Sequence, residues 1–239
     1  MPIKENGKFQ PDSRAFIHSQ GRVPYNNAVK KIEKELGFNI QTSKDSLGRE
    51  FAGNIDWIEA GMLNQALEVK TPYAKQEVDY LHALYLASEK QLQLRYVKGN
   101  LIKPDLAKKL FEDKVKKQSP WRASWLDNDF KTNGEDLEVH YNHIFYRKKK
   151  IIDYKSEVLD KDTLIENKQI DVLDYITKNH TSQGLISKDV KLGKFYSYNL
   201  GEDNNSVAGF YAVDNRAYFV CDRNPANRLS YFGVESVAD

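Results

Sequence analysis

The sequence predicts an α+β fold in which helices come first and a mostly antiparallel sheet follows. Two observations lead to this prediction. Before residue 90, apolar residues recur every three or four positions, which is the spacing of one helix face. From Gln91 onward, several segments instead alternate with period two, which is typical of strands. We therefore expect a mainly helical region over residues 1–90, packed on or continuous with the core, and a second region over residues 91–239.

Three helices are expected in the first region. Gly37 is placed to end the first, because glycine readily adopts the left-handed conformation that closes a helix. Asn54 is the expected N-cap of the second, and Thr71-Pro72 marks the start of the third, with Thr as N-cap and Pro at the first helical position. The apolar faces of the first two helices consist of Val29, Ile32 and Leu36, and of Ile55, Ile58, Met62 and Leu67.

Strands and two further helices are expected in the second region. Period-two alternation predicts strands at residues 92–96, 137–141 and 144–146. Helical spacing predicts helices over residues 106–115 and 171–178. An aromatic loop is expected at residues 120–125, and short strands with turns from Phe195 to the end.

Composition and charge exclude several classes of partner. The chain has 239 residues, enough to bury a core without covalent cross-links. Its formal net charge is only +2, so we expect no nucleic-acid partner. The basic run Arg147-Lys-Lys-Lys150 is interpreted as a solvated turn between strands, with a phosphate-binding patch as the alternative.

The cysteine count limits the cross-links that the chain can form, and the apolar runs indicate whether it carries a signal peptide or a membrane span. Cys221 is the only cysteine, so the chain alone forms no disulfide and no cysteine-based zinc site. Its alternation with Ala217 and Phe219 predicts a buried small hydrophobe. The N-terminus lacks the apolar core of a signal peptide, and no apolar run approaches the ~18 residues of a membrane span. We assign no localisation, and presentation at a cell surface would need another export route.

One set of residues suggests a metal-dependent nuclease. Glu68-Val-Lys70, with Asp56 upstream, has the acid-x-Lys spacing in which carboxylates hold the metal and lysine polarises the attacking water. That arrangement needs a strand, whereas residues 63–67 have helical spacing. The nuclease centred on Asp56, Glu68 and Lys70 therefore stays the alternative function.

The histidines give no catalytic or metal-binding pattern. His140 and His143 are three residues apart on a predicted strand, which directs them to opposite faces. The sequence also lacks the phosphate-binding and nucleophile motifs of common enzymes. We expect no catalytic residues, no metal and no cofactor.

Residues 207–234 use a restricted set of amino acids. None of the chain's 27 lysines lies there, although about three are expected in 28 residues of this composition. Glu, Gln, Met and Trp are also absent, while three arginines show that positive charge is tolerated. Surface composition alone does not readily produce this pattern.

Alternation divides this stretch into two predicted faces. The face expected to pack on the core holds Ala208, Phe210, Ala212, Ala217, Phe219 and Cys221. The other face is chemically mixed, and its Tyr and Asn side chains resemble those of an antibody binding surface. An ordinary half-exposed sheet is the alternative interpretation.

Several motifs in the second half of the chain resemble archaeal diversity-generating retroelement variable proteins. The framework motifs are Pro120-Trp-Arg-Ala-Ser-Trp-Leu-Asp-Asn-Asp-Phe130, His140-Tyr-Asn-His143 and Asn204-Asn-Ser-Val-Ala208. The variable-region motifs are Val207-Ala-Gly-Phe-Tyr-Ala212, Arg216-Ala217, Cys221-Asp-Arg223-Asn-Pro225 and Gly233-Val234. In such systems a reverse transcriptase rewrites template adenines, mainly in AAC codons. The residue types that result exclude Lys, Glu, Gln, Met and Trp, as in residues 207–234.

The resemblance implies a C-type-lectin-like fold over residues 91–239 and a ligand-binding, receptor- or adhesin-like function. The implied partner is a protein or a cell-surface molecule of unknown identity, and the oligomeric state stays open. The implied ligand-binding residues are Tyr211, Val213, Asp214, Asn215, Tyr218, Val220, Asp222, Asn224, Asn227, Leu229 and Tyr231.

Related folds suggest two other activities, and the sequence argues against both. Calcium-dependent lectins use a Glu-Pro-Asn or Gln-Pro-Asp loop. The first is absent and the second occurs only as Gln10-Pro11-Asp12, far from the lectin-like region. Asn224-Pro225-Ala226 lacks the carboxylates that calcium requires. Formylglycine-generating enzymes need paired cysteines, so we expect a protein that is not an enzyme.

Overall fold

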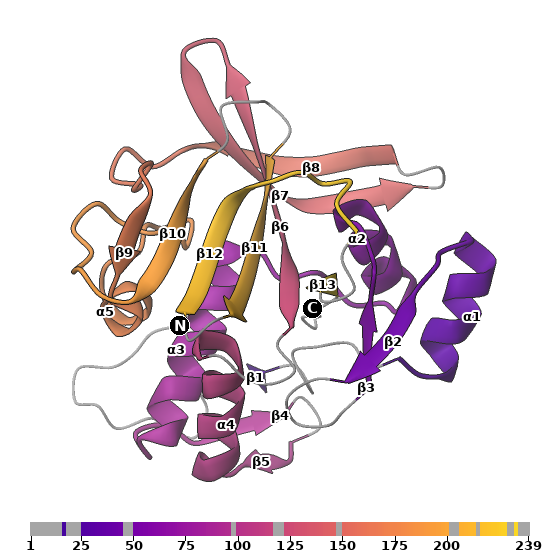
Figure 1. Ribbon diagram of the computed structural model, residues 1–239, viewed down its shortest axis with the longest axis horizontal. Helices are drawn as coiled ribbons and strands as arrows, with labels where there is room; N and C mark the ends of the chain where they lie inside the picture. Colours follow the sequence, from indigo (N-terminus) through magenta and orange to yellow (C-terminus); the bar gives the residue numbers. More distant parts are fainter. Residues whose placement is uncertain are drawn as a thin grey trace.

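The fold is mixed α+β (Figure 1). The computed structural model describes residues 16–17, 25–44, 50–96, 99–116, 122–146, 150–200, 206–213, 216–228 and 232–233. In chain order the elements are β1 (Phe16–Ile17), α1 (Asn27–Leu36), β2 (Gln41–Lys44), β3 (Glu50–Gly53), α2 (Trp57–Ala66), α3 (Ala74–Ser88), β4 (Leu94–Tyr96), β5 (Leu101–Ile102), α4 (Pro104–Val115), β6 (Ala123–Asn133), β7 (Asp136–Tyr146), β8 (Lys150–Val158), β9 (Lys168–Ile170), α5 (Val172–Thr177), β10 (Phe195–Leu200), β11 (Ser206–Val213), β12 (Arg216–Arg223) and β13 (Phe232–Gly233).

A large sheet forms the centre of the molecule. Its strand order is β2-β3-β13-β6-β11-β12-β10-β9, and β7 and β8 continue from β6 as successive antiparallel neighbours. Among the described pairs of this sheet, only β10–β12 and β13–β6 are parallel. The predicted α+β class with a mostly antiparallel sheet is therefore confirmed. A smaller sheet joins β1, β4 and β5.

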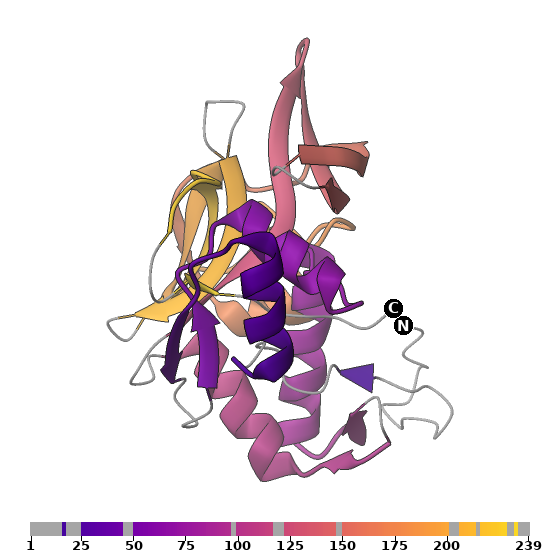
Figure 2. The ribbon, with the colours of Figure 1, turned by 90° about the vertical axis from the view of Figure 1, so that its right-hand side faces the viewer.

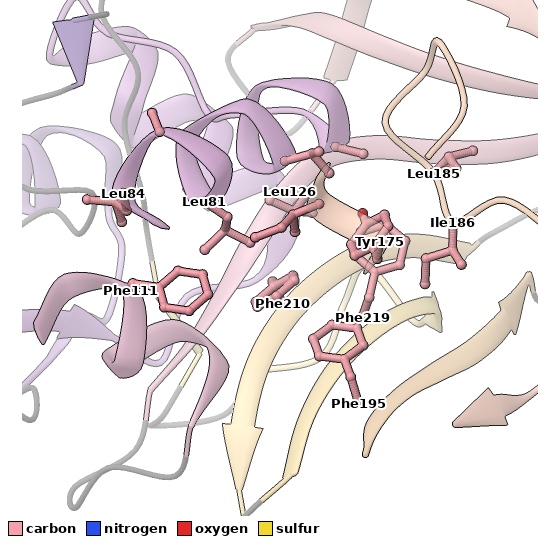
Figure 3. Packing of buried hydrophobic residues seen from close by; sticks show 14 of the residues in the cluster. Leu81, Leu84, Phe111, Leu126, Tyr175, Leu185, Ile186, Phe195, Phe210 and Phe219 are labelled. Carbon is pink, nitrogen blue, oxygen red and sulfur yellow. The ribbon is translucent and has the colours of Figure 1, made fainter. Parts of the chain in front are cut away.

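Helices cover the central strands on both faces. On one face, α3, α4 and α5 pack against β11 and β12, where Phe210 and Phe219 meet Leu81, Phe111 and Tyr175 in one apolar cluster (Figure 3). On the other face, a second cluster combines side chains of α1, α2, β3 and β6 with the alternate side chains of β11 and β12. Figure 2 shows α1 and α2 beside the C-terminal strands, with α4 at the bottom of the view. The middle of the sheet is thus a buried layer.

The first two helices form where the sequence predicted them, but one begins at a different cap. Asn26 caps α1 by accepting from two backbone amides, and Gly37 ends it at φ 71°, as predicted. The second helix is capped by Asp56 rather than Asn54, because Asp56 and Glu59 form a reciprocal capping box. Asn54 instead adopts φ 60° and donates from its side chain to the carbonyl of Asn39.

The third helix begins two residues later than expected. Tyr73 is its N-cap, whereas Thr71 is buried and its hydroxyl accepts from the Asn64 side chain at 3.0 Å. The Pro72 carbonyl is also engaged, because it accepts from the backbone of Asp127 at 2.8 Å. These tertiary bonds hold residues 71–72 outside the helix. The helices predicted near residues 106–115 and 171–178 are confirmed as α4 and α5.

Three predicted segments differ from the observed ones. Ala123 and Trp125 belong to β6 rather than to a loop, and the fully buried Trp125 ring donates to the carbonyl of Ile55 at 2.8 Å. Residues 137–146 form the single strand β7 instead of two. The strand predicted at 92–96 is limited to Leu94–Tyr96. Residues 147–149 of the basic run and residues 10–12 lie outside the described chain, and Lys150 begins β8.

Candidate functional site

Strands β11 and β12, which carry most of residues 207–234, lie in the middle of the sheet (Figure 1). They pair antiparallel, with Phe210 opposite Phe219 and Tyr211 opposite Tyr218. Strand β6 flanks β11 and strand β10 flanks β12. Framework elements therefore hold this pair on both edges.

The predicted core face of this pair is confirmed where its side chains are described. Ala208, Phe210, Phe219 and Cys221 are all buried in the cluster beneath α3 and α4. Burial raises the pKa of the Cys221 thiol well above its ordinary value, so this cysteine is an unreactive core residue. The side chains of Ala212 and Ala217 lie outside the described set.

The prediction that the alternate face is open to solvent is wrong for three residues. Tyr211 and Tyr218 are only 8% and 9% exposed, and Val220 is fully buried. The two tyrosine rings stack at 4.8 Å, and Arg223 Nη2 donates to the Tyr211 hydroxyl at 2.7 Å. The physical reason is that the side of the sheet carrying α1 and α2 is also covered. Both sets of alternating residues are apolar or aromatic, which is typical of a strand buried on both faces.

Among the described side chains of residues 207–234, the exposed ones lie at the end of β12 and in the turn that follows. Asp222 and Asn224 are exposed, and Asn227 is half-buried. The remaining predicted binding positions lie outside the described residues: Asp214, Asn215, Leu229, Tyr231 and the side chain of Val213.

The turn formed by residues 223–228 is fixed to the start of α2. The backbone amide of Trp57 donates to the carbonyl of Pro225 at 3.0 Å. Arg228 pairs with Asp56 at 3.4 Å and also contacts Glu59. Both carboxylates are nearly buried, so this ion pair is better shielded than a surface pair. Within the turn, the Asn224 side chain accepts from the backbone of Ala226.

The residues of the nuclease alternative are not brought together. Asp56 lies at the N-terminus of α2 and pairs with Arg228. Glu68 and Lys70 are exposed beyond the other end of this ten-residue helix, which is about 15 Å long. Glu68 also has φ 58°, so it does not belong to a regular strand. This geometry disfavours the shared metal site that the alternative requires.

The two histidines of β7 face the same side, contrary to the expectation from their spacing. Asn142, between them, adopts φ 56°, and the pairing of β7 with β8 shifts register between Tyr141 and Ile144. A bulge of this kind offsets the strict alternation of a strand. His140 and His143 consequently converge on Asp129 of β6. Asparagine within a strand pattern was the available signal, because it is enriched at positive φ.

A buried cluster of carboxylates and imidazoles results. Asp129 Oδ1 lies 3.2 Å from His140 Nδ1 and 3.3 Å from His143 Nε2. His143 Nδ1 lies 2.6 Å from Asp127 Oδ1, and His140 Nε2 lies 3.2 Å from Glu138 Oε2. We refer to Asp127, Asp129, Glu138, His140 and His143 as the His/Asp cluster, in which Glu138 is half-buried and the other four residues are buried. Sequence reasoning did not find it.

Aromatic rings enclose the His/Asp cluster. Tyr154 stacks on His140 at 4.4 Å, and Trp57 meets His143 edge-on at 5.0 Å. The His143 side chain has no exposed surface. A cavity of about 520 Å³ borders the cluster, and its lining includes Asp127, His143 and Tyr154. Glu68 and Lys70 line the same cavity, and Asp56 does not.

Charge in the His/Asp cluster is balanced by proton binding. Burial lowers the pKa of His143, but the carboxylates of Asp127 and Asp129 outweigh that effect and raise it to about 9. Burial alone raises the pKa of Asp129, yet His143, Lys131 and His140 bring it below its usual range. Without a bound cation, His143 is therefore an imidazolium between two carboxylates at neutral pH.

This ion pairing predicts that metal-free protein loses stability as pH rises. The unfolded chain holds the His143 proton with a pKa of about 6.5. Because the folded pKa is higher, at about 9, the stabilisation is complete below about pH 6.5 and disappears as pH rises through about 9. The expected loss is about 3 kcal/mol. Urea unfolding at pH 6.5, 7.5 and 9 measures it.

The control is His143→Asn, which keeps an amide donor near Asp127 but cannot titrate. Its free energy of unfolding should change less over the same pH range, and the comparison cancels the titration of Cys221 that both proteins share. Equal slopes for the two proteins would contradict the assignment of the proton to His143.

The chain is therefore an α+β protein with a His/Asp cluster between β6 and β7 and a turn at residues 223–228 that is fixed to the start of α2. In three comparisons, no family model, no curated protein and no solved structure matched it. Among the described residues, no helix is long and apolar enough to cross a membrane.

Proposed function

We propose that this protein is a receptor- or adhesin-like ligand-binding protein whose C-terminal surface is diversified by retroelement-driven adenine mutagenesis, and that it is not an enzyme. In this proposal the sheet belongs to a C-type-lectin-like fold. The observation that carries this proposal is the restricted set of amino acids in residues 207–234. This stretch lacks Lys, Glu, Gln, Met and Trp, although the chain has 27 lysines. Substitution at the adenines of AAC codons produces none of these five residue types.

The turn after β12 supports the proposal because it separates anchoring residues from exposed ones. Pro225 and Arg228 hold the turn on α2, and neither is among the residues proposed to vary. Asp222 and Asn224 are exposed, and Asn227 is half-buried. A turn fixed before binding loses little conformational entropy when a ligand arrives. Its side chains can then change while its backbone stays in place.

The burial of three predicted binding residues reduces the number of residues to which we assign ligand contact. Tyr211, Tyr218 and Val220 contribute to the apolar cluster against α1 and α2, so changing them alters the core as well as the surface. Among the described side chains, we therefore assign ligand contact to Asp222, Asn224 and Asn227. Val213, Asp214, Asn215, Leu229 and Tyr231 stay in the proposed set on their sequence positions alone.

A pair of substitutions on β12 tests this division. Asp222→Asn should change the free energy of unfolding by no more than about 0.5 kcal/mol, because the side chain is exposed. Tyr218→Asn should cost about 3 kcal/mol, because it removes a buried ring stacked between Tyr196 and Tyr211. Urea unfolding of both variants gives the comparison. Equal costs would show that burial does not separate variable positions from scaffold.

The genetic arrangement tests the proposed function itself. The neighbouring DNA should hold a near-copy of the codons for residues 207–234 beside a reverse transcriptase gene. The near-copy should carry adenine-rich codons, mainly AAC, opposite the codons for Asp222, Asn224 and Asn227. The two copies should differ mainly at adenines of the near-copy, while the codons for Phe210 and Phe219 agree. A locus without such a copy would contradict the proposal.

A further inference from the structure

We propose that Asp129, His140 and His143 bind a divalent transition-metal ion, with one ligand atom from each side chain. One ligand atom from each of the three residues lies within 4.8 Å of the other two, and all three residues are buried. The inference rests on the His/Asp cluster alone and does not depend on the proposed ligand-binding function.

The distances to Asp129 fit a coordination shell. Metal bonds to imidazole and carboxylate are about 2.0–2.2 Å long, so neighbouring ligand atoms in a tetrahedral or octahedral shell lie about 3.0–3.5 Å apart. Asp129 Oδ1 is 3.2 Å from His140 Nδ1 and 3.3 Å from His143 Nε2. The ligand atoms of the three residues all lie within 4.8 Å of one another, so a contraction of this set brings them to bonding distance of one ion.

Outer carboxylates orient both imidazoles towards Asp129. Asp127 Oδ1 lies 2.6 Å from Nδ1 of His143, and this contact leaves Nε2 of the same ring to face Asp129. Glu138 Oε2 lies 3.2 Å from Nε2 of His140, and this contact leaves Nδ1 of that ring to face Asp129 Oδ1. Metal-binding histidines usually have such a carboxylate behind them, because it fixes the tautomer and raises the basicity of the ligand nitrogen.

Two atoms of the cluster lack a hydrogen bond, which is an independent indication of a ligand. His143 Nε2 and Asp129 Oδ1 are buried, and neither forms a hydrogen bond of acceptable geometry, although they lie 3.3 Å apart. Their side chains are 0% and 5% exposed. Buried polar atoms without a partner are rare in native proteins. A cation between the two atoms would bind both, in place of the ion pair that they form with each other in the metal-free protein, while Asp129 Oδ2 keeps its pairing with Lys131.

The ligand set selects the class of metal. Two imidazoles and one carboxylate suit Zn²⁺, Fe²⁺ or Mn²⁺, whereas Ca²⁺ and Mg²⁺ prefer oxygen ligands throughout. Three protein ligands leave coordination positions for water or a small ligand. A cavity of about 520 Å³ borders the His/Asp cluster at Asp127 and His143.

Titration calorimetry with Zn²⁺ on the chelator-treated full chain tests the site. Wild type should bind one equivalent, and at saturation the melting temperature should rise by roughly 5–10 °C. His140→Gln and His143→Asn should each weaken binding at least about 100-fold. Asp127→Asn should weaken it about 10- to 100-fold through the orientation of His143. His82→Gln, a histidine change outside the cluster, should leave binding unchanged.

Circular dichroism first establishes that each variant is folded, and Asp129→Asn provides an isosteric ligand change if a histidine variant does not fold. It should also bind Zn²⁺ at least about 10-fold more weakly than wild type. Failure of wild type to bind one equivalent would overturn the proposal. Undiminished binding in the folded ligand variants would also overturn it, because the ion would then lie elsewhere.

Discussion

Replacing Gly184 with alanine is expected to destabilise the protein by more than about 4 kcal/mol or to prevent folding. Gly184 has φ 78°, and an added Cβ would lie 2.3 Å from the backbone N and Cα of Lys75. These atoms belong to the first turn of α3, so they cannot move aside without displacing the helix. Urea unfolding measures the loss, and expression as insoluble protein would be its extreme form.

Gly37→Ala is the matched control for this change. Gly37 has nearly the same φ, 71°, but an added Cβ there would meet nothing within 4 Å. The cost should therefore be about 1–2 kcal/mol, the price of a left-handed conformation for a residue with a Cβ. The difference between the two variants isolates the clash with α3. Similar losses at both positions would contradict the packing of residue 184 against Lys75.

Replacing Lys114 with methionine is expected to cost about 3–5 kcal/mol. Lys114 Nζ lies 2.8 Å from Glu77 Oε1, and both side chains are almost fully buried, at 4% and 2% exposure. Methionine fills a similar volume but removes the positive charge that lies beside the buried carboxylate of Glu77. The pair joins α3 to α4 beneath β11, with Lys114 Nζ 5.9 Å from the centre of the Phe210 ring.

The double variant Glu77→Leu with Lys114→Met distinguishes this effect from packing. The double variant also removes the buried carboxylate that Lys114 neutralises, so most of the lost stability should return. Urea unfolding of the wild type, both single variants and the double variant gives the coupling energy. A double variant less stable than Lys114→Met would show that the charge of Glu77 is not what makes the single change costly.

Trp57 connects the two regions to which we assign function. Its backbone amide holds Pro225 of the C-terminal turn, and its ring packs edge-on against His143. The ring nitrogen also donates to the carbonyl of Leu126 on β6 at 2.7 Å. The first residue of α2 therefore supports both the turn and the His/Asp cluster.

The spacing of apolar residues correctly predicted several helices, because a helix forms from interactions between residues close in the sequence. The spacing of Val29, Ile32 and Leu36 with Gly37 behind them predicted α1, and comparable spacing predicted α4 and α5. Cap positions were less predictable because several polar residues precede each helix. Asp56 rather than Asn54 caps α2 because Glu59 completes a capping box with it.

The sequence by itself determined the α+β class, the positions of most helices and the inner face of β11 and β12. Only the tertiary structure decided that the outer face is covered too, because alternation separates two faces without revealing what packs on each. Likewise, spacing alone placed His140 and His143 on opposite faces. The left-handed Asn142 and the pairing of β6 with β7 bring both to Asp129, since contacts between distant residues depend on register and bulges.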